Sequence, residues 1–280
     1  MERTVVIETL QKKAPKVHCL TNPVTMQDVA NILLAAGGSA IMAQNPEEAA
    51  DITALCHATL LNTGVPDAEK FRSCILAGKR ANELGHPVVL DPVGVGASAY
   101  RKREMQGLLK EVRMSVIRCN QEEAFTLLSL GEEISDPLIQ RNGRISGGVE
   151  SAVSEETEKV RQLAVRLAKM YSCTVLISGA SDVISDGEQI RVLAGGDDRM
   201  RRITGSGCML SALCALFCGT GLPIFEAACA AGEVWKQSSE EAGEWTDRHI
   251  GGIGSFHVAL FDALDQICHV QDEMETDKRS

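Results

Sequence analysis

Short apolar runs alternate along the chain with longer stretches in which apolar residues recur every three or four positions. The runs are KVHCL (16–20), SAIM (39–42), ATLLN (58–62), PVVLD (87–91), SVIRC (115–119) and CTVLIS (173–178), and they indicate buried strands. The helical stretches between them are 24–36, 47–56, 67–84, 101–112, 120–129 and 154–171. This alternation predicts a three-layer α/β/α fold with a mostly parallel central sheet.

The pattern changes after residue 182. The segment DVISDGEQIRVLAGG (182–196) reads as two short strands around the turn SDGE, which predicts a hairpin at a sheet edge. Helices then dominate, at 207–219, 223–242 and 252–270. The polar segment 131–150 is expected to form a surface excursion, and 271–280 a frayed tail. We see no repeat or linker, so we expect a single domain over 1–280.

Composition and charge narrow the class of partner. The net charge is −10, which argues against a broad nucleic-acid-binding face. No apolar run approaches the length of about 20 residues that a membrane span needs, and the charged start lacks the apolar core of a signal peptide. The ten cysteines show no CxxC pair and stand mostly in hydrophobic segments. We therefore expect buried free thiols, a cytoplasmic protein and a small-molecule substrate.

Candidate chemistry should follow the strands, because ligands of open α/β sheets gather at the carboxyl ends of strands. Asp91 ends one apolar run and is followed by Gly94 and Gly96 in DPVGVGAS. An aspartate beside such a loop can hold Mg²⁺ directly or through water, and the glycines let backbone approach a ligand. The alternative is an Asp-Pro turn that caps a helix.

Earlier in the chain, Asn22 and Thr25 follow the first strand in TNPVTMQDVAN. On spacing alone, turn and cap chemistry is the preferred interpretation of both. Met42 ends the second strand, where a methionine usually belongs to the core but could also line an apolar substrate pocket.

The segment IRCNQEEA (117–124) also places polar residues at the end of a predicted strand, the fifth one. Asn120 and Glu123 have the spacing of a capping box, yet both would face a phosphate and a metal ion at the sheet edge. Arg118 just before them suits a nucleotide phosphate, and its alternative is a surface ion pair.

The loop ITGSGC (203–208) is the sharpest feature. Gly205 and Gly207, on either side of Ser206, let the backbone turn and expose its N–H groups before an apolar helix. Such donors suit the charged oxygens of a transferring phosphoryl group. The loop lacks the Lys-Ser/Thr of a Walker A motif and the βαβ unit of a dinucleotide fingerprint. Cys208 stands where a kinase would place a base, or is a small core residue.

Together, TNPVTMQDVAN, DPVGVGAS, IRCNQEEA and TGSGCMLSA, in this order and spacing, make the chain resemble the hydroxyethylthiazole kinases. These are thiamine-salvage enzymes of the ribokinase-like superfamily. The resemblance covers essentially the whole chain and is weakest at 131–150 and the tail. It implies ATP- and Mg²⁺-dependent phosphorylation of the primary hydroxyl of 4-methyl-5-(2-hydroxyethyl)thiazole, by a homotrimer with active sites between subunits.

The resemblance also implies residue roles. Arg118, Ser178 and Asn120 are expected to contact ATP, and Asp91 and Glu123 to hold the metal ion. The family usually has threonine where Ser178 stands; the hydroxyl is kept, so we expect little effect.

On the acceptor side, Met42 and Gly205 are expected to contact the thiazole. The segment 22–25, with Asn22 and Thr25, would enter a neighbouring subunit's pocket. The catalytic loop comprises Gly205, Ser206, Gly207 and Cys208, whose backbone N–H groups form an anion hole. Cys208 fits the family's pattern of cysteine in place of aspartate, as a modest base whose pKa the helix N-terminus lowers towards partial thiolate.

Two other functions remain open at the sequence level. One is another ribokinase-like enzyme, either a kinase for a different small alcohol or an ATP-dependent NAD(P)H-hydrate dehydratase. The other is a non-catalytic ligand-binding relative, against which the intact loop and its surrounding charged residues argue.

Overall fold

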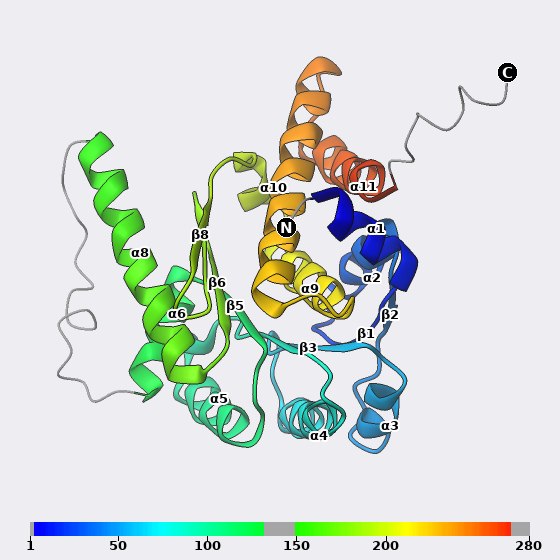
Figure 1. The fold of residues 1–280 in the computed structure, drawn as a ribbon, viewed down its shortest axis with the longest axis vertical. Helices are drawn as coiled ribbons and strands as arrows, with labels where there is room; N and C mark the ends of the chain where they lie inside the picture. Colours follow the sequence, from blue (N-terminus) through cyan, green and yellow to red (C-terminus); the bar gives the residue numbers. More distant parts are fainter. Residues whose placement is uncertain (1–2, 132–148, 270–280) are drawn as a thin grey trace, which may run out of the picture.

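The computed structural model describes residues 3–131 and 149–269, and these residues form one eight-stranded sheet at its centre (Figure 1). The strands are β1 (Lys16–Leu20), β2 (Ser39–Ile41), β3 (Ala58–Asn62), β4 (Val88–Asp91), β5 (Val116–Asn120), β6 (Thr174–Ser178), β7 (Asp182–Ser185) and β8 (Ile190–Leu193). Their order across the sheet is β2-β1-β3-β4-β5-β6-β7-β8. β1 to β6 run parallel, and β7 and β8 add an antiparallel hairpin at one edge.

Helices cover both faces of this sheet (Figure 1). One face carries α1 (Arg3–Lys13), α2 (Met26–Ala35), α9 (Ser206–Cys218), α10 (Ile224–Arg248) and α11 (Ile253–His269). The other carries α3 (Ala49–Ala54), α4 (Ala68–Leu84), α5 (Ala99–Glu111), α6 (Gln121–Gly131) and α8 (Val149–Tyr171). The predicted three-layer α/β/α architecture is therefore confirmed.

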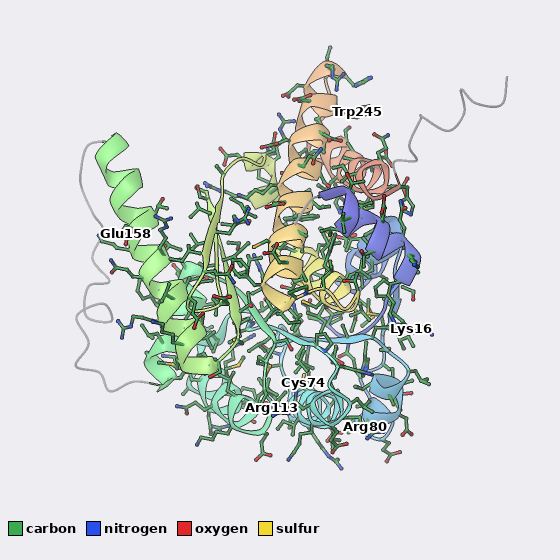
Figure 2. The ribbon with its side chains drawn as sticks, viewed as in Figure 1. Lys16, Cys74, Arg80, Arg113, Glu158 and Trp245 are labelled. Atoms are coloured by element: carbon green, nitrogen blue, oxygen red, sulfur yellow. The ribbon has the colours of Figure 1, made fainter. Side chains whose placement is uncertain are left out.

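Two cores explain why the strands read as continuous apolar runs. Successive residues of a strand point to opposite faces, so Leu60 of β3 packs with the α9 and α10 layer while Leu61 packs with the α4 to α8 layer. Figure 2 shows how a covering helix is oriented, since Cys74 of α4 lies on the side of the sheet and Arg80 lies away from it.

The strand register brings polar residues together at one edge of the sheet. Asn62 of β3 lies opposite Asp91 of β4, and Asn120 of β5 lies opposite Ser178 of β6. Each is the last residue of its strand. Because parallel strands end on the same side, this edge collects the groups that could bind a ligand.

The predicted strands and the edge hairpin are confirmed, with each strand end within one residue of its expected position. Helix α10 continues to Arg248, six residues beyond the predicted end at 242. Polar residues interrupt the apolar pattern in this half of the helix. The hydroxyls of Ser238 and Thr246 donate to carbonyls one turn back, so both side chains are buried with their hydrogen bonds made. Helix α1 was not predicted.

The expected surface excursion at 131–150 is helical at its described ends, where α6 ends at Gly131 and α8 begins at Val149. Residues 132–148 and the predicted tail 271–280 lie outside the described residues.

All ten cysteines are free and buried, as expected from their apolar surroundings. Among the described residues, no helix combines the length and apolar character needed to cross a bilayer.

Candidate active site

The glycine loop leads directly into helix α9. Gly205 has a left-handed backbone (φ 83°, ψ 4°), a conformation that glycine adopts without steric cost, and no side chain caps the helix behind it. The N–H groups of the first helical turn, including those of Gly207 and Cys208, have no acceptor within an α-helix. The loop therefore offers backbone donors and positive partial charge to an anion, as predicted from its glycines.

The thiol of Cys208 is buried in the first turn of α9, with only 8% of the residue exposed. Its sulfur accepts N–H bonds from the side-chain amides of Asn62 (3.1 Å) and Asn22 (3.7 Å). Burial nevertheless raises the pKa of the thiol to about 11, and the negative charge of Asp91 adds to the rise. The expected lowering of this pKa is wrong, because loss of hydration outweighs the partial charge of the helix.

Asp91 ends β4 and is almost fully buried, at 1% exposure. One carboxylate oxygen, Oδ2, accepts an N–H bond from Asn62 (2.7 Å), whereas Oδ1 has no hydrogen-bond partner. Burial raises the pKa of Asp91 to about 6, although the Arg118 guanidinium, 3.9 Å from Oδ1, opposes the rise. A buried carboxylate oxygen without a partner is costly unless a ligand or cation satisfies it.

Glu123 and Asn120 form the capping box that their spacing predicted. The Asn120 side chain accepts from the Glu123 N–H, and Glu123 Oε2 accepts from the Asn120 N–H, each at 2.9 Å. The second glutamate oxygen, Oε1, accepts from the N–H of Gly94 (2.8 Å). Glu123 thereby ties the start of α6 to the loop after β4, and its charge stands near Asp91.

These two carboxylates provide the test of fit for a metal ion. Within residues 3–131 and 149–269, no three His, Cys, Asp or Glu side chains are grouped to hold a metal. Oδ1 of Asp91 accepts no hydrogen bond, although the Arg118 guanidinium lies 3.9 Å away, and both oxygens of Glu123 already accept backbone N–H bonds. This donor set fits a cation that keeps most of its water, as Mg²⁺ does, rather than one that needs a full protein cage.

Arg118 of β5 is not the surface ion pair that was the alternative interpretation, because its side chain is only 11% exposed. Its guanidinium donates to the hydroxyl of Ser178 on β6. It also lies against Gly207, where a β-carbon would collide with the guanidinium. Glycine at 207 therefore lets the guanidinium and the start of α9 approach each other.

A cleft of about 440 Å³ opens beside this cluster. Five residues expected at the active site line it: Arg118, Asn120, Ser178, Ser206 and Gly207. The structure thus gathers all three expected ATP contacts and part of the glycine loop around one cavity. Its volume is in the range of small-molecule sites.

The far wall of the cleft was not predicted. It includes Asp182 of β7 together with Trp235 and Lys236 of α10, and the Lys236 ammonium lies 3.3 Å from the Asp182 carboxylate. The available signal in the sequence was the pair Trp235 and Lys236, which interrupts a helix rich in alanine, glycine and serine. Arg201, in the 3₁₀ helix Asp198–Arg202 just before the glycine loop, also lines the cleft.

The expected acceptor-side residues occupy two places. Asn22 and Thr25 are buried beside the glycine loop of their own chain, and are not presented to a neighbouring subunit's pocket as expected. Asn22 bonds to Cys208, and Thr25 lies in close contact with Gly205. Met42 is partly buried and packs against the core on the α9 face, and the carbonyl of its neighbour Ala43 accepts from the ring of His18 (2.8 Å).

Two buried polar residues at this edge were missed by sequence analysis. Asn62 contacts both Asp91 and Cys208, and Lys70 of α4 donates to the carbonyls of Thr21 (2.9 Å) and Gly64 (2.7 Å). Burial lowers the pKa of the Lys70 ammonium. Asn62 is the last letter of the apolar run ATLLN, and Lys70 stands in an amphipathic helix, so neither forms a recognisable motif.

Comparison with known proteins gives a consistent match over nearly the whole chain. The family model described as the hydroxyethylthiazole kinase family matches residues 7–270. A hydroxyethylthiazole kinase from Alkaliphilus oremlandii is 39% identical, over 94% of this chain and 92% of that protein.

Solved structures agree with the fold. The hydroxyethylthiazole kinase of Pyrococcus horikoshii has a TM-score of 0.79 and 32% identity, over 94% of this chain and 93% of that one. An ADP complex of Bacillus subtilis pyridoxal kinase has a TM-score of 0.61 at 18% identity, covering 81% of this chain and 92% of that one. At that identity the second likeness shows the fold alone.

Proposed function

The chain belongs to the hydroxyethylthiazole kinase family, and from that premise we propose that it transfers the γ-phosphoryl group of ATP to the primary hydroxyl of 4-methyl-5-(2-hydroxyethyl)thiazole, in thiamine salvage. The observation that carries the proposal is the position of the glycine loop. Ser206 and Gly207 of this loop line the cleft beside Arg118, and the next residue, Cys208, belongs to the buried cluster with Asn62. A phosphoryl group passing between the cleft and this cluster would meet the first-turn amides of α9.

The cleft is the proposed nucleotide site. Arg118, Asn120 and Ser178 line it next to Ser206 and Gly207, so a guanidinium, two polar side chains and the positive end of α9 face the same space. Charge-assisted N–H bonds of this kind suit the oxygens of a polyphosphate. The indole of Trp235 and the ion pair of Lys236 with Asp182 border the part of the cleft left for the nucleoside.

Asp91 and Glu123 are the proposed metal-facing pair. When bound, Mg²⁺ would neutralise the charge that develops on the phosphate oxygens. Asp91, whose Oδ1 accepts no hydrogen bond, would hold the ion, while Glu123 would contribute charge and also holds the loop at Gly94 in place.

The acceptor hydroxyl is proposed to lie near Cys208, with Gly205, Asn22, Thr25 and Met42 on the thiazole side. Because the pKa of the buried thiol is about 11, Cys208 is protonated at neutral pH and acts weakly as a base. A loose phosphoryl-transfer transition state needs little proton removal beforehand. The backbone amides of 205–208 therefore carry most of the catalysis in this proposal.

The direct test is release of ADP by the purified protein with the thiazole alcohol, in Mg²⁺ and in EDTA. We expect ADP release that requires both the alcohol and the metal. A panel of other small alcohols and hydrated NADH tests the related activities. Binding of the thiazole without ADP release would contradict a kinase, and faster turnover of another substrate would reassign the acceptor.

The metal assignment has its own variants. Asp91→Ala and Glu123→Ala should lower turnover far more than they change folding. Glu123→Ala also strips acceptors from two backbone N–H groups, at about 1–2 kcal/mol each, so Glu123→Gln is the milder second variant. The control is Glu111→Gln, an exposed carboxylate paired with Lys79. Wild-type turnover in both site variants would remove the assignment.

We extend the proposal to the assembly, as a homotrimer with active sites between subunits. Val24 and Val65, beside Asn22 and Gly64, are 64% and 52% exposed, and a neighbouring subunit would cover such apolar side chains. Light scattering should give three times the chain mass of 30.1 kDa. A fully active monomer would exclude shared sites.

Two further parts of the proposal concern the chain as a whole. A single domain is supported by the continuous eight-stranded sheet within the described residues. A cytoplasmic location is supported by the ten free, buried thiols, which a reducing compartment permits.

A further inference from the structure

Asn62 lies at the centre of the buried polar cluster and has no role in the function proposed so far. It ends β3, is fully buried, and lies opposite Asp91 in the sheet. Its side-chain amide makes four hydrogen bonds. The Nδ2 group donates to Asp91 Oδ2 (2.7 Å) and Cys208 Sγ (3.1 Å), and Oδ1 accepts from Asn22 Nδ2 (3.0 Å) and from the Gly64 N–H (3.0 Å).

The partners of Asn62 determine which way its amide faces. Two N–H donors point at Oδ1, while a carboxylate and a sulfur face Nδ2. The flipped amide would set its NH₂ group against the donors of Asn22 and Gly64 and its oxygen against the Asp91 carboxylate. Three of the four buried contacts would become repulsive, and only the Cys208 thiol could adapt by donating to the oxygen, so the hydrogen-bond network favours one orientation.

The surrounding backbone is shaped for this arrangement. A β-carbon at Gly64 would lie 2.8 Å from Asn22 Nδ2 and 3.1 Å from Asn62 Oδ1, so glycine is needed for the amides to meet. The buried ammonium of Lys70 donates to the carbonyls of Gly64 and Thr21, and so ties together the turns that follow β3 and β1.

The network also constrains Cys208. Its sulfur accepts from both Asn62 and Asn22, so the S–H hydrogen has to point away from the two amides. At the same time Asn62 occupies one oxygen of Asp91 and leaves Oδ1 unpartnered. One amide therefore sets the orientation of both groups.

We propose that Asn62 is a positioning residue for phosphoryl transfer, which uses its two N–H bonds to hold the Asp91 carboxylate and the Cys208 thiol in fixed relative orientation. This inference rests on the proposed function, since it concerns the same transfer step. A positioning residue acts in the transition state more than in substrate binding, so its loss should appear in kcat.

The test replaces the side-chain amide of Asn62 by groups that lack its two N–H donors. Asn62→Asp keeps the shape and both acceptor contacts but replaces the NH₂ group by an oxygen that faces the Asp91 carboxylate, whereas Asn62→Ser removes the NH₂ group without adding charge. We expect kcat to fall about 10- to 100-fold while KM for ATP and for the thiazole alcohol changes less than about threefold. The matched control is Asn82→Asp, at a half-buried asparagine whose amide both donates to and accepts from the Arg113 backbone. We expect the control to keep wild-type kcat.

A double-mutant cycle with Cys208→Ala separates positioning from general damage. If Asn62 acts partly through the thiol, the loss of kcat in Asn62→Asp/Cys208→Ala is smaller than the product of the two single losses. A double-variant loss equal to the product of the two single losses would overturn the coupling to the thiol, and an effect confined to KM would overturn the proposal as a whole.

Folding is checked by near-UV circular dichroism, and Asn62→Ser replaces Asn62→Asp if the aspartate variant is unfolded. Failure of both variants to fold would make Asn62 a residue of the fold alone, which also overturns the inference. A wild-type protein that releases no ADP with the thiazole alcohol is a different result. It would refute the proposed function, and the cycle would then be run on whichever substrate of the panel is turned over.

Discussion

Gly205 and Thr25 lie in direct contact, so that a β-carbon on Gly205 would be 2.5 Å from Cγ2 of Thr25 and 3.0 Å from its Cβ. The start of α2 therefore sets how closely the glycine loop can approach the edge of the sheet. Because Gly205 also has a positive φ of 83°, an alanine there meets two separate penalties.

We expect Gly205→Ala to lower kcat by at least about tenfold, because the displaced loop misplaces the first-turn amides. Gly221→Ala is the matched control, since Gly221 has a φ of 90° and a β-carbon there would meet no other atom within 4 Å. It should cost about 1 kcal/mol of stability and leave kcat unchanged. Adding Thr25→Ser to Gly205→Ala should restore part of the activity. Equal behaviour of the two alanine variants would show that the contact has no effect on catalysis.

Cys208 should be nearly dispensable as a base. With a pKa of about 11, only about one thiol in a thousand is ionised at pH 8. Cys208→Ala should therefore keep kcat within about tenfold of wild type, below the usual contribution of a general base. Cys208→Asp should exceed the alanine variant, because Asn62 and Asn22 can donate to a carboxylate there. An aspartate variant no faster than alanine would mean that only the amides matter.

Gly207 and Arg118 provide a test of the nucleotide side. A methyl group at 207 would displace the guanidinium from its place beside Ser178. Gly207→Ala should raise KM for ATP several-fold and change KM for the alcohol little, as measured by initial rates with each substrate varied. Arg118→Lys should act in the same direction, since lysine lacks the planar fork. A rise confined to KM for the alcohol would contradict this assignment.

The buried Asp91 predicts a pH-dependent stability difference. Its folded-state pKa is raised to about 6 from 3.8, so between these values the folded state binds more protons than the unfolded state. Wild-type stability then falls as the pH rises through this window. Asp91→Asn lacks the effect and should be more stable than wild type at pH 7.5, by at most about 3 kcal/mol, with the difference shrinking at pH 4.

The measurement is denaturant unfolding in EDTA without nucleotide. Glu111→Gln is a control of opposite sign, because Lys79 lowers the pKa of Glu111. At pH 7.5 the wild-type protein should therefore be more stable than Glu111→Gln. A wild-type protein more stable than Asp91→Asn at pH 7.5 would contradict the prediction. A gain in stability together with lost turnover would indicate that Asp91 is retained for function at the expense of stability.

Much of the site followed from strand ends. Asp91, Arg118 and Asn120 each stand where an apolar run stops, and parallel strands end on one side, so their meeting could be predicted. Asn62 occupies an equivalent place, yet one asparagine at the end of ATLLN carries no local signal. Trp235 and Lys236 reach the cleft from a helix more than fifty residues beyond Asp182, which no spacing rule connects.

The amino-acid sequence by itself determined the order of strands and helices, the glycine loop and the family, because apolar periodicity and short motifs are local properties. Only the tertiary structure decided that Cys208 is a protonated thiol, that Arg118 is buried against Gly207, and that Asn62 joins Asp91 to Cys208. The physical reason is that burial and hydrogen-bond partners depend on which segments pack together. A helix terminus predicts a lower thiol pKa, but the surrounding layers remove the water that would have stabilised the thiolate.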